Sequence, residues 1–173
     1  HENEIAQSEA AGRPFARIWM HNGMIETDAA KMSKSEGNIF QLSAALDRYG
    51  REAVVAYLTS GHYRQPLAFG EEQMEEAVAR VERLRNFFRD NPLGASGEGS
   101  PDNSRGASGD PSPDAHAGAA ARIAAFRDAL ADDFNTPRAL AEAFELVGEA
   151  NRGEMDGNEA AQTLAEMLDV VGL

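Results

Sequence analysis

The only two lysines of this chain, Lys31 and Lys34, lie three positions apart in the segment DAAKMSKSEGN, residues 28–38. The chain has sixteen basic residues, and the other fourteen are arginines spread from Arg13 to Arg152. Lysine carries a compact charge with three donors on a flexible stem, whereas arginine presents a rigid planar fork. Two lysines on a loop that ends in glycine suit a polyphosphate whose charge moves during a reaction. The alternative for both lysines is a solvated turn on the surface.

Composition narrows the classes of protein that carry such a loop. The 173 residues include 29 acidic and 16 basic side chains, for a net charge of −13, and no cysteine. A general binder of nucleic acids or anionic membranes needs phosphate-neutralising surface, so the net charge argues against both classes. The sequence contains no apolar run as long as a membrane span. The many carboxylates and few lysines also resemble proteins of a high-salt cytoplasm, where the Debye length is short.

The first part of the chain is predicted to contain one short helix and two short strands. The pattern of residues 1–12 is helical, and Gly12 ends the helix. Residues 13–28 then change to aromatic and β-branched side chains, which favour strands. We expect a strand, a tight turn at Asn22-Gly23, and a second strand that leads into the lysine segment.

Beyond the lysine segment the sequence predicts helices. Ser43 and Gly50 mark the N-cap and the end of one short helix, and Gly61 ends the next. After Gly70, apolar residues recur every three or four positions, which indicates a long amphipathic helix. Three further helices are predicted, over residues 119–131, 137–151 and 158–168.

Two local signals refine this helical region. Thr136 is the predicted N-cap of the 137–151 helix, and Pro137 stands at its first position, where a missing N–H costs nothing. Residues 91–118 consist mainly of glycine, serine, proline, aspartate and alanine. Such a segment buries too little surface to offset its chain entropy, so we expect a disordered insertion at about 91–118.

The pentapeptide KMSKS, Lys31–Ser35, resembles the signature loop of class I aminoacyl-tRNA synthetases. Its flanks narrow the resemblance, because HENEIAQSEA, FARIWMHNGMI, LTSGHYRQPLAF and DDFNTPRAL are similar to the cysteinyl-tRNA synthetase family. The resemblance covers nearly the whole chain except residues 91–118, and it is to an internal fragment of the family's sequence.

The resemblance implies a fold class and a division into regions. The fold class is mostly α with a small β element, in which the C-terminal edge of a class I Rossmann-type catalytic domain is followed by a helical bundle. Residues 1–40 are then the end of the catalytic domain with the KMSKS loop. Residues 41–69 are a helical connector, and residues 70–173 are the helical bundle domain.

The resemblance also implies an activity. The family activates cysteine with ATP to form cysteinyl-adenylate and transfers the aminoacyl group to tRNA(Cys). Lys34 is the residue expected to bind ATP and to stabilise charge on its β- and γ-phosphates, and Lys31 is expected to support the loop or the outer phosphates. The expected partners are tRNA(Cys), cysteine and ATP, for a cytoplasmic monomer that binds no membrane.

A zinc site is implied in the same way. In the family, two histidines in tandem precede Glu-Asn-Glu, and the first histidine and the second glutamate bind zinc together with two upstream cysteines. Glu4 matches that glutamate, and His1 matches the second histidine, which is not a ligand. The resemblance therefore implies Zn²⁺ in the complete enzyme with Glu4 as one ligand. The other ligands are absent from this chain, so the piece alone is expected to be metal-free and inactive.

Some residues allow two interpretations. His62, Tyr63 and Arg64 either contact the tRNA stem or form an ordinary cluster at a helix end. Trp19, the only tryptophan, is expected to be a partly buried packing residue of a strand.

Two other functions compete with the synthetase. One is the related ligase that activates cysteine in the same way and joins it to an amino sugar in thiol biosynthesis. The other is a non-catalytic helical tRNA-binding module that keeps the loop as a relic. The sequence upstream of His1 would distinguish an enzyme from the non-catalytic module, because the enzyme needs two cysteine ligands and a His-x-Gly-His type motif there.

Overall fold

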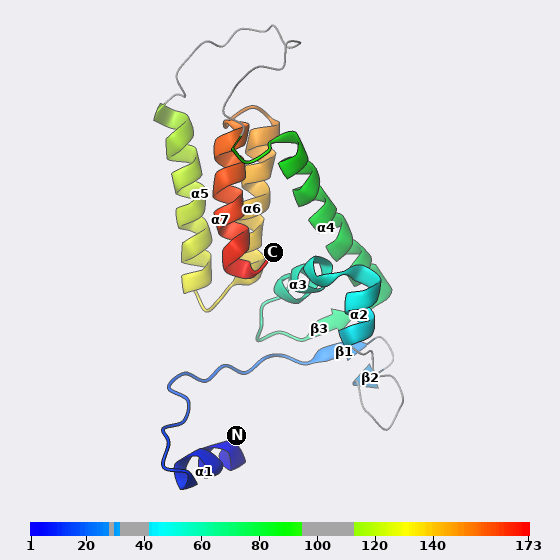
Figure 1. The fold of residues 1–173 in the computed structure, drawn as a ribbon, viewed down its shortest axis with the longest axis vertical. Helices are drawn as coiled ribbons and strands as arrows, with labels where there is room; N and C mark the ends of the chain where they lie inside the picture. Colours follow the sequence, from blue (N-terminus) through cyan, green and yellow to red (C-terminus); the bar gives the residue numbers. More distant parts are fainter. Residues whose placement is uncertain (28–29, 32–41, 95–112) are drawn as a thin grey trace, which may run out of the picture.

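The computed structural model describes residues 1–27, 30–31, 42–94 and 113–173. It confirms a mostly helical fold with a small sheet (Figure 1). None of the helices in these ranges has the length and apolar character that crossing a membrane requires. The elements in chain order are α1 (Glu2–Ala10), β1 (Ile25–Thr27), β2 (Ala30–Lys31), α2 (Leu42–Tyr49), α3 (Arg51–Thr59), β3 (Leu67–Phe69), α4 (Glu71–Asp90), α5 (Pro113–Ala131), α6 (Thr136–Asn151) and α7 (Gly157–Val171).

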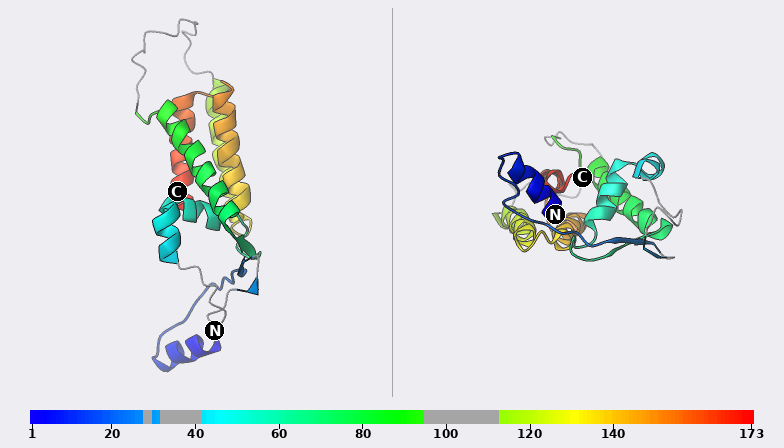
Figure 2. Two further views of the ribbon diagram at one scale, coloured as in Figure 1. Left: turned by 90° about the vertical axis from the view of Figure 1, so that its right-hand side faces the viewer. Right: turned by 90° about the horizontal axis from the view of Figure 1, so that it is seen from below.

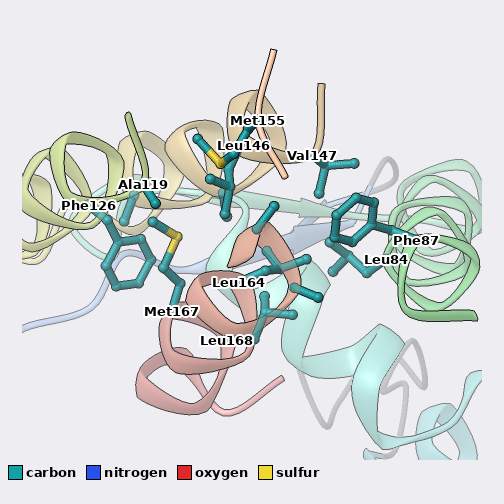
Figure 3. Close-up of a cluster of buried hydrophobic side chains, with 14 of the residues drawn as sticks. Leu84, Phe87, Ala119, Phe126, Leu146, Val147, Met155, Leu164, Met167 and Leu168 are labelled. Atoms are coloured by element: carbon teal, nitrogen blue, oxygen red, sulfur yellow. The ribbon is translucent and has the colours of Figure 1, made fainter. Parts of the chain in front are cut away.

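The larger hydrophobic cluster lies in the helical bundle. Helices α5, α6 and α7 run side by side, and α4 extends from the connector and packs against them (Figures 1 and 2). Apolar side chains from all four helices meet between them, as the close-up in Figure 3 shows. Each large apolar side chain that is fully buried stabilises the fold by about 1.5–3 kcal/mol. The largest of these in the bundle are Phe126, Leu146, Leu164, Met167 and Val147.

A smaller cluster joins the connector to the sheet. It contains buried residues of α2, α3 and the first half of α4, with Leu67 and Phe69 of β3 packed against them. Tyr57 is 3% exposed and donates its hydroxyl hydrogen to the carbonyl oxygen of Ala68 at 2.9 Å. Burial raises the pKa of Tyr57 to about 12. The connector helices therefore support β3 from one side.

The sheet has the strand order β2-β1-β3. Strand β1 pairs antiparallel with β2, which places Glu26 opposite Lys31, and parallel with β3, which places Glu26 opposite Ala68. The predicted turn at Asn22-Gly23 between two strands is wrong, because residues 11–24 contain no strand and β1 is the first.

Gly23 has a different role from the predicted one. Its N–H donates to the carbonyl oxygen of Tyr63 at 2.6 Å, and an added Cβ would overlap the carbonyl group of Gln65. Glycine is needed here because two backbone segments approach closely. The Asn-Gly pair therefore marks a contact between distant segments.

Three predicted helix boundaries also differ from the structure. Helix α2 begins at Leu42, so Ser43 lies within its first turn. Helix α5 begins at Pro113, earlier than predicted, because proline suits the first helical position and the alanines that follow favour helix. Residues 113–118 of the predicted insertion are therefore helical, and residues 95–112 lie outside the described residues.

The cap of α6 is the third difference. The side chain of Asn135 accepts a hydrogen bond from the Arg138 N–H at 3.2 Å, so Asn135 is the N-cap. The hydroxyl of Thr136 instead donates to the carbonyl oxygen of Gly61 at 3.4 Å, across to the connector. The Thr136 side chain therefore forms a tertiary contact, and it is not the N-cap that the sequence predicts.

Asp133, in the turn between α5 and α6, joins the bundle to the loop between α3 and β3. Its carboxylate accepts hydrogen bonds from Arg64 Nε at 2.6 Å, from Arg64 Nη2 at 2.9 Å and from the Tyr63 hydroxyl at 2.7 Å. His62 Nε2 lies 3.8 Å from the same carboxylate. We call these four residues the Asp133 clasp. The Arg64 guanidinium and the Tyr63 hydroxyl hold the pKa of the Asp133 carboxyl well below its usual range.

The capping assignment predicts a difference between two neighbouring alanine variants. Asn135→Ala is expected to lower the free energy of unfolding by about 1 kcal/mol, because it leaves the Arg138 N–H without its acceptor. Thr136→Ala should cost less, since its hydrogen bond to Gly61 is long. Urea unfolding of both variants measures the difference. An equal or larger loss in Thr136→Ala would restore the sequence-based assignment.

The clasp predicts a pH dependence. Because the folded-state pKa of Asp133 is depressed, its contribution to stability is complete above the unfolded-state pKa of about 3.9 and fades as the pH falls below that value. Asp133→Asn should therefore lower the melting temperature at pH 7, and its difference from wild type should shrink below about pH 4. Thermal unfolding between pH 7 and pH 2.5 measures this.

The adjacent carboxylate provides the control for this experiment. Asp132 is 70% exposed and lies 3.8 Å from the Arg138 guanidinium. Asp132→Asn should change the melting temperature little at any pH, because exposed ion pairs stabilise weakly. A difference between Asp133→Asn and wild type that stayed constant down to pH 2.5 would contradict the role of the ionised carboxylate.

Candidate functional site

The lysine segment follows directly from the hairpin of the sheet. The backbone of Lys31 forms the end of β2, opposite Glu26 of β1. Lys34 lies outside the described residues. The structure therefore places the start of the segment on an edge strand, and the predicted phosphate-binding roles of both lysines stay predictions.

The base of the hairpin is held by backbone contacts from the connector. Strand β1 lies between β2 and β3, and the Leu67 N–H donates to the carbonyl oxygen of Met24 at 2.9 Å just before β1 begins. A cavity of about 280 Å³ lies at this junction, between residues 22–25 and residues 61–67. Because β3 packs on the connector cluster, the position of β2 depends on the connector.

Glu4, the predicted zinc ligand, lies on α1. Its side chain is 61% exposed. Among the described residues, no three His, Cys, Asp or Glu side chains come together in a group able to hold a metal. One carboxylate does not fit zinc, which takes three or four protein ligands.

The segment between α1 and β1 exposes apolar and aromatic side chains. Trp19 is 42% exposed and lies outside any strand, so the prediction of a partly buried strand residue is wrong. It stacks on the His21 ring and lies edge-on to the His1 ring. Ile18, Met20 and Met24 are also exposed, with Ile18 at 81%.

The 62–64 cluster has the structural partner described above. Tyr63 and Arg64 direct their hydrogen-bond donors at Asp133, and the Arg64 guanidinium lies over the Tyr63 ring at 5.0 Å from its centre. These contacts favour the interpretation as an ordinary structural cluster. A contact of these residues with tRNA stays a prediction.

Sequence reasoning missed Asp133. Its partners lie 69 and 70 positions earlier in the chain, so no local pattern links them. In the sequence, the motif DDFNTP stands out only through its resemblance to a family. Its two consecutive positive φ angles, 57° at Asp133 and 52° at Phe134, are unusual for residues other than glycine.

Two family models match this chain. Residues 1–79 match the model described as tRNA synthetases class I (C) catalytic domain. Residues 125–173 match the model described as DALR domain. The first match contains α1, the sheet, the connector and the start of α4, and the second contains α6 and α7.

Curated relatives match the chain over nearly its whole length. A cysteine–tRNA ligase of Geobacter sulfurreducens is 42% identical over 178 aligned residues, which cover 99% of this chain and 35% of that protein. The cysteine–tRNA ligase of Azotobacter vinelandii is 40% identical, with 99% of this chain and 33% of that protein covered. That of Pseudothermotoga lettingae is 44% identical, with 92% and 32% covered. The chain thus spans about a third of the length of these relatives.

One solved structure has a similar fold at low sequence identity. The crystal structure of the ternary complex of Agrobacterium radiobacter agnB2 LeuRS-tRNA-LeuAMS superimposes with a TM-score of 0.66 at 20% identity, covering 87% of this chain and 20% of that one. This likeness concerns the fold alone. The family models and the relatives show the descent: the chain is a homologue of cysteine–tRNA ligases that contains sequence of a class I tRNA synthetase catalytic domain and of a DALR domain.

Proposed function

We propose that this chain is the part of a cysteine–tRNA ligase that carries the KMSKS loop and the helical bundle. The observation that carries the proposal is the 42% identity to a cysteine–tRNA ligase across 99% of the chain, which includes an intact KMSKS segment. In the proposed reaction, a carboxylate oxygen of cysteine attacks the α-phosphorus of ATP. The bond from that phosphorus to pyrophosphate breaks, which leaves cysteinyl-adenylate.

The second step of the proposed reaction is acyl transfer. A terminal hydroxyl of tRNA(Cys) attacks the carbonyl carbon of cysteinyl-adenylate, the hydroxyl proton is lost, and AMP leaves. Both steps move negative charge onto phosphate oxygens. Donors that are already in place when this charge develops lower the barrier.

Lys34 is the proposed donor to the β- and γ-phosphates. The hairpin supports this role, because Lys31 ends a strand whose neighbour is tied to the connector by backbone hydrogen bonds. The lysine segment is thus attached to the sheet, and lysine is the basic residue type that carries a point charge on a flexible stem. Lys31 is proposed to support the loop or the outer phosphates.

Glu4 is proposed as one zinc ligand of the complete enzyme. A carboxylate on an exposed helix is able to join a site whose other ligands come from outside this chain. The described residues alone do not form the site.

The bundle is proposed to face tRNA(Cys). The support is indirect: a DALR domain match and a fold shared with a LeuRS that was solved with tRNA. The competing amino-sugar ligase and the non-catalytic module have no similar support, since the relatives named above are cysteine–tRNA ligases.

The lysine roles predict kinetics for the complete enzyme. Lys34→Ala should slow adenylate formation by roughly a hundred- to a thousandfold, about 3 kcal/mol, while the affinity for cysteine stays nearly unchanged. Lys34→Arg should recover part of the rate, because the planar fork places its charge differently. Pre-steady-state adenylate formation at saturating ATP measures both.

Lys31→Ala is the matched comparison for these variants. It removes the same charge three positions away and should cost less than Lys34→Ala. An unchanged rate in Lys34→Ala, or an effect limited to cysteine affinity, would leave the two lysines as a solvated surface turn.

The metal role of Glu4 predicts zinc content. In the complete enzyme, Glu4→Gln should lower the zinc bound per protein molecule, because a neutral amide replaces a charged ligand. Glu2→Gln is the control, since Glu2 lies on the same helix. Elemental analysis after dialysis measures the metal without any need for activity. Full zinc content in Glu4→Gln would exclude the role.

A further inference from the structure

The connector and the bundle are joined along α4, at Leu173, which packs against both hydrophobic clusters, and around Asp133. The first is α4, whose early residues Met74 and Val81 lie in the connector cluster and whose later residues Leu84 and Phe87 lie in the bundle cluster. A single helix allows bending and rotation about its own axis between the two bodies. A second point of attachment is needed to fix their mutual orientation.

Leu173 supplies one further attachment through apolar packing, and the Asp133 clasp supplies a polar one. The clasp joins the α5–α6 turn at one end of the bundle to the loop before β3 (Figure 1). Three hydrogen bonds converge on one carboxylate, two of them from the fork of Arg64, and such bidentate pairs fix direction as well as distance. The hydrogen bond from Thr136 to Gly61 lies beside them.

The backbone of the turn is held in a strained form. Asp133 and Phe134 both have positive φ, and Phe134 is 56% exposed, so burial of its ring does not account for the conformation. Strained backbone persists where surrounding contacts determine it. Backbone hydrogen bonds close the turn locally, from the Phe134 N–H to Leu130 at 3.0 Å and from the Asn135 N–H to Ala129 at 3.1 Å. At Asp133, the bonds to Tyr63 and Arg64 add to them.

A short path leads from the clasp to the lysine hairpin. Tyr63, which donates its side-chain hydroxyl to Asp133, accepts the Gly23 N–H on its own backbone carbonyl at 2.6 Å. Gly23 lies two residues before β1, and β1 pairs with the strand that ends in Lys31. The loop between α3 and β3 therefore contacts both the turn between α5 and α6 and the base of the hairpin.

We infer that Asp133 is a positioning residue, which holds the bundle in a fixed orientation to the sheet that carries the lysine hairpin and thereby aligns tRNA for acyl transfer. The part that concerns tRNA rests on the proposed function. Adenylate formation needs the hairpin, which strand pairing holds. A tRNA that contacts both bodies binds best when their orientation already matches its shape.

The orientation is measurable without any activity. Because this chain has no cysteine, Asp47→Cys on α2 and Glu145→Cys on α6 provide two unique spin-label positions, both exposed. Pulsed electron resonance should give one narrow distance distribution in the otherwise wild-type chain. Adding Asp133→Asn should broaden it, because asparagine tolerates positive φ but lacks the charge that binds Arg64.

Two further variants test whether the clasp acts as a pair. Asp132→Asn, one residue away, should leave the distribution narrow. Arg64→Gln should broaden it as Asp133→Asn does, and the double variant should be no broader than either single variant, since both remove the same interaction. A narrow distribution in Asp133→Asn, or equal broadening by Asp132→Asn, would overturn the inference.

The complete enzyme tests the consequence for tRNA. Asp133→Asn should raise KM for tRNA by roughly fivefold or more while cysteine-dependent exchange of pyrophosphate into ATP changes less than about twofold. Equal losses in exchange and transfer would overturn the role in alignment. If the wild-type enzyme showed no cysteine-dependent exchange, the proposed function would fail, and the distance measurement would still decide the role of Asp133 in orientation.

Discussion

The arrangement of this molecule depends on α4, which contributes to two hydrophobic clusters at once. The helix has 20 residues, which corresponds to a length of about 30 Å, and its apolar stripe is shared between the connector and the bundle. An amphipathic helix of this length is stabilised mainly by burial of its apolar face. Loss of either cluster would therefore leave half of the stripe in water.

The placement of the lysine hairpin follows from this arrangement. Met74 of α4 packs with the connector helices, the connector supports β3, and β3 pairs with β1, which in turn pairs with the strand that ends at Lys31. The pairing of β3 with β1 joins segments distant in sequence, whereas β1 and β2 are neighbours in the chain. The lysine loop is thus attached to the helical part of the protein, although it precedes that part in the chain.

The net charge of −13 does not reveal that many charged side chains form ion pairs. Several arginines of the described helices pair with carboxylates, as in the ion pairs of Arg122 with Glu142 and Glu149 between α5 and α6. Both acceptors raise the pKa of Arg122, the larger effect coming from Glu149. The resemblance of the composition to proteins of a high-salt cytoplasm stays a prediction.

The sequence by itself determined the helices, the small β element and the identity of the lysine segment, because these depend on local patterns and on a short motif that is legible without tertiary contacts. Gly12 ends α1 with a positive φ as predicted, and Pro137 lies in the first turn of α6. Tertiary structure decided what depends on partners far along the chain. It assigned Gly23 to a backbone contact with residues 63–65, gave the cap of α6 to Asn135, and brought Asp133 to Arg64. The physical reason is that a hydrogen bond across some 70 residues leaves no periodic trace in the sequence, since only folding of the intervening helices brings its donor and acceptor together.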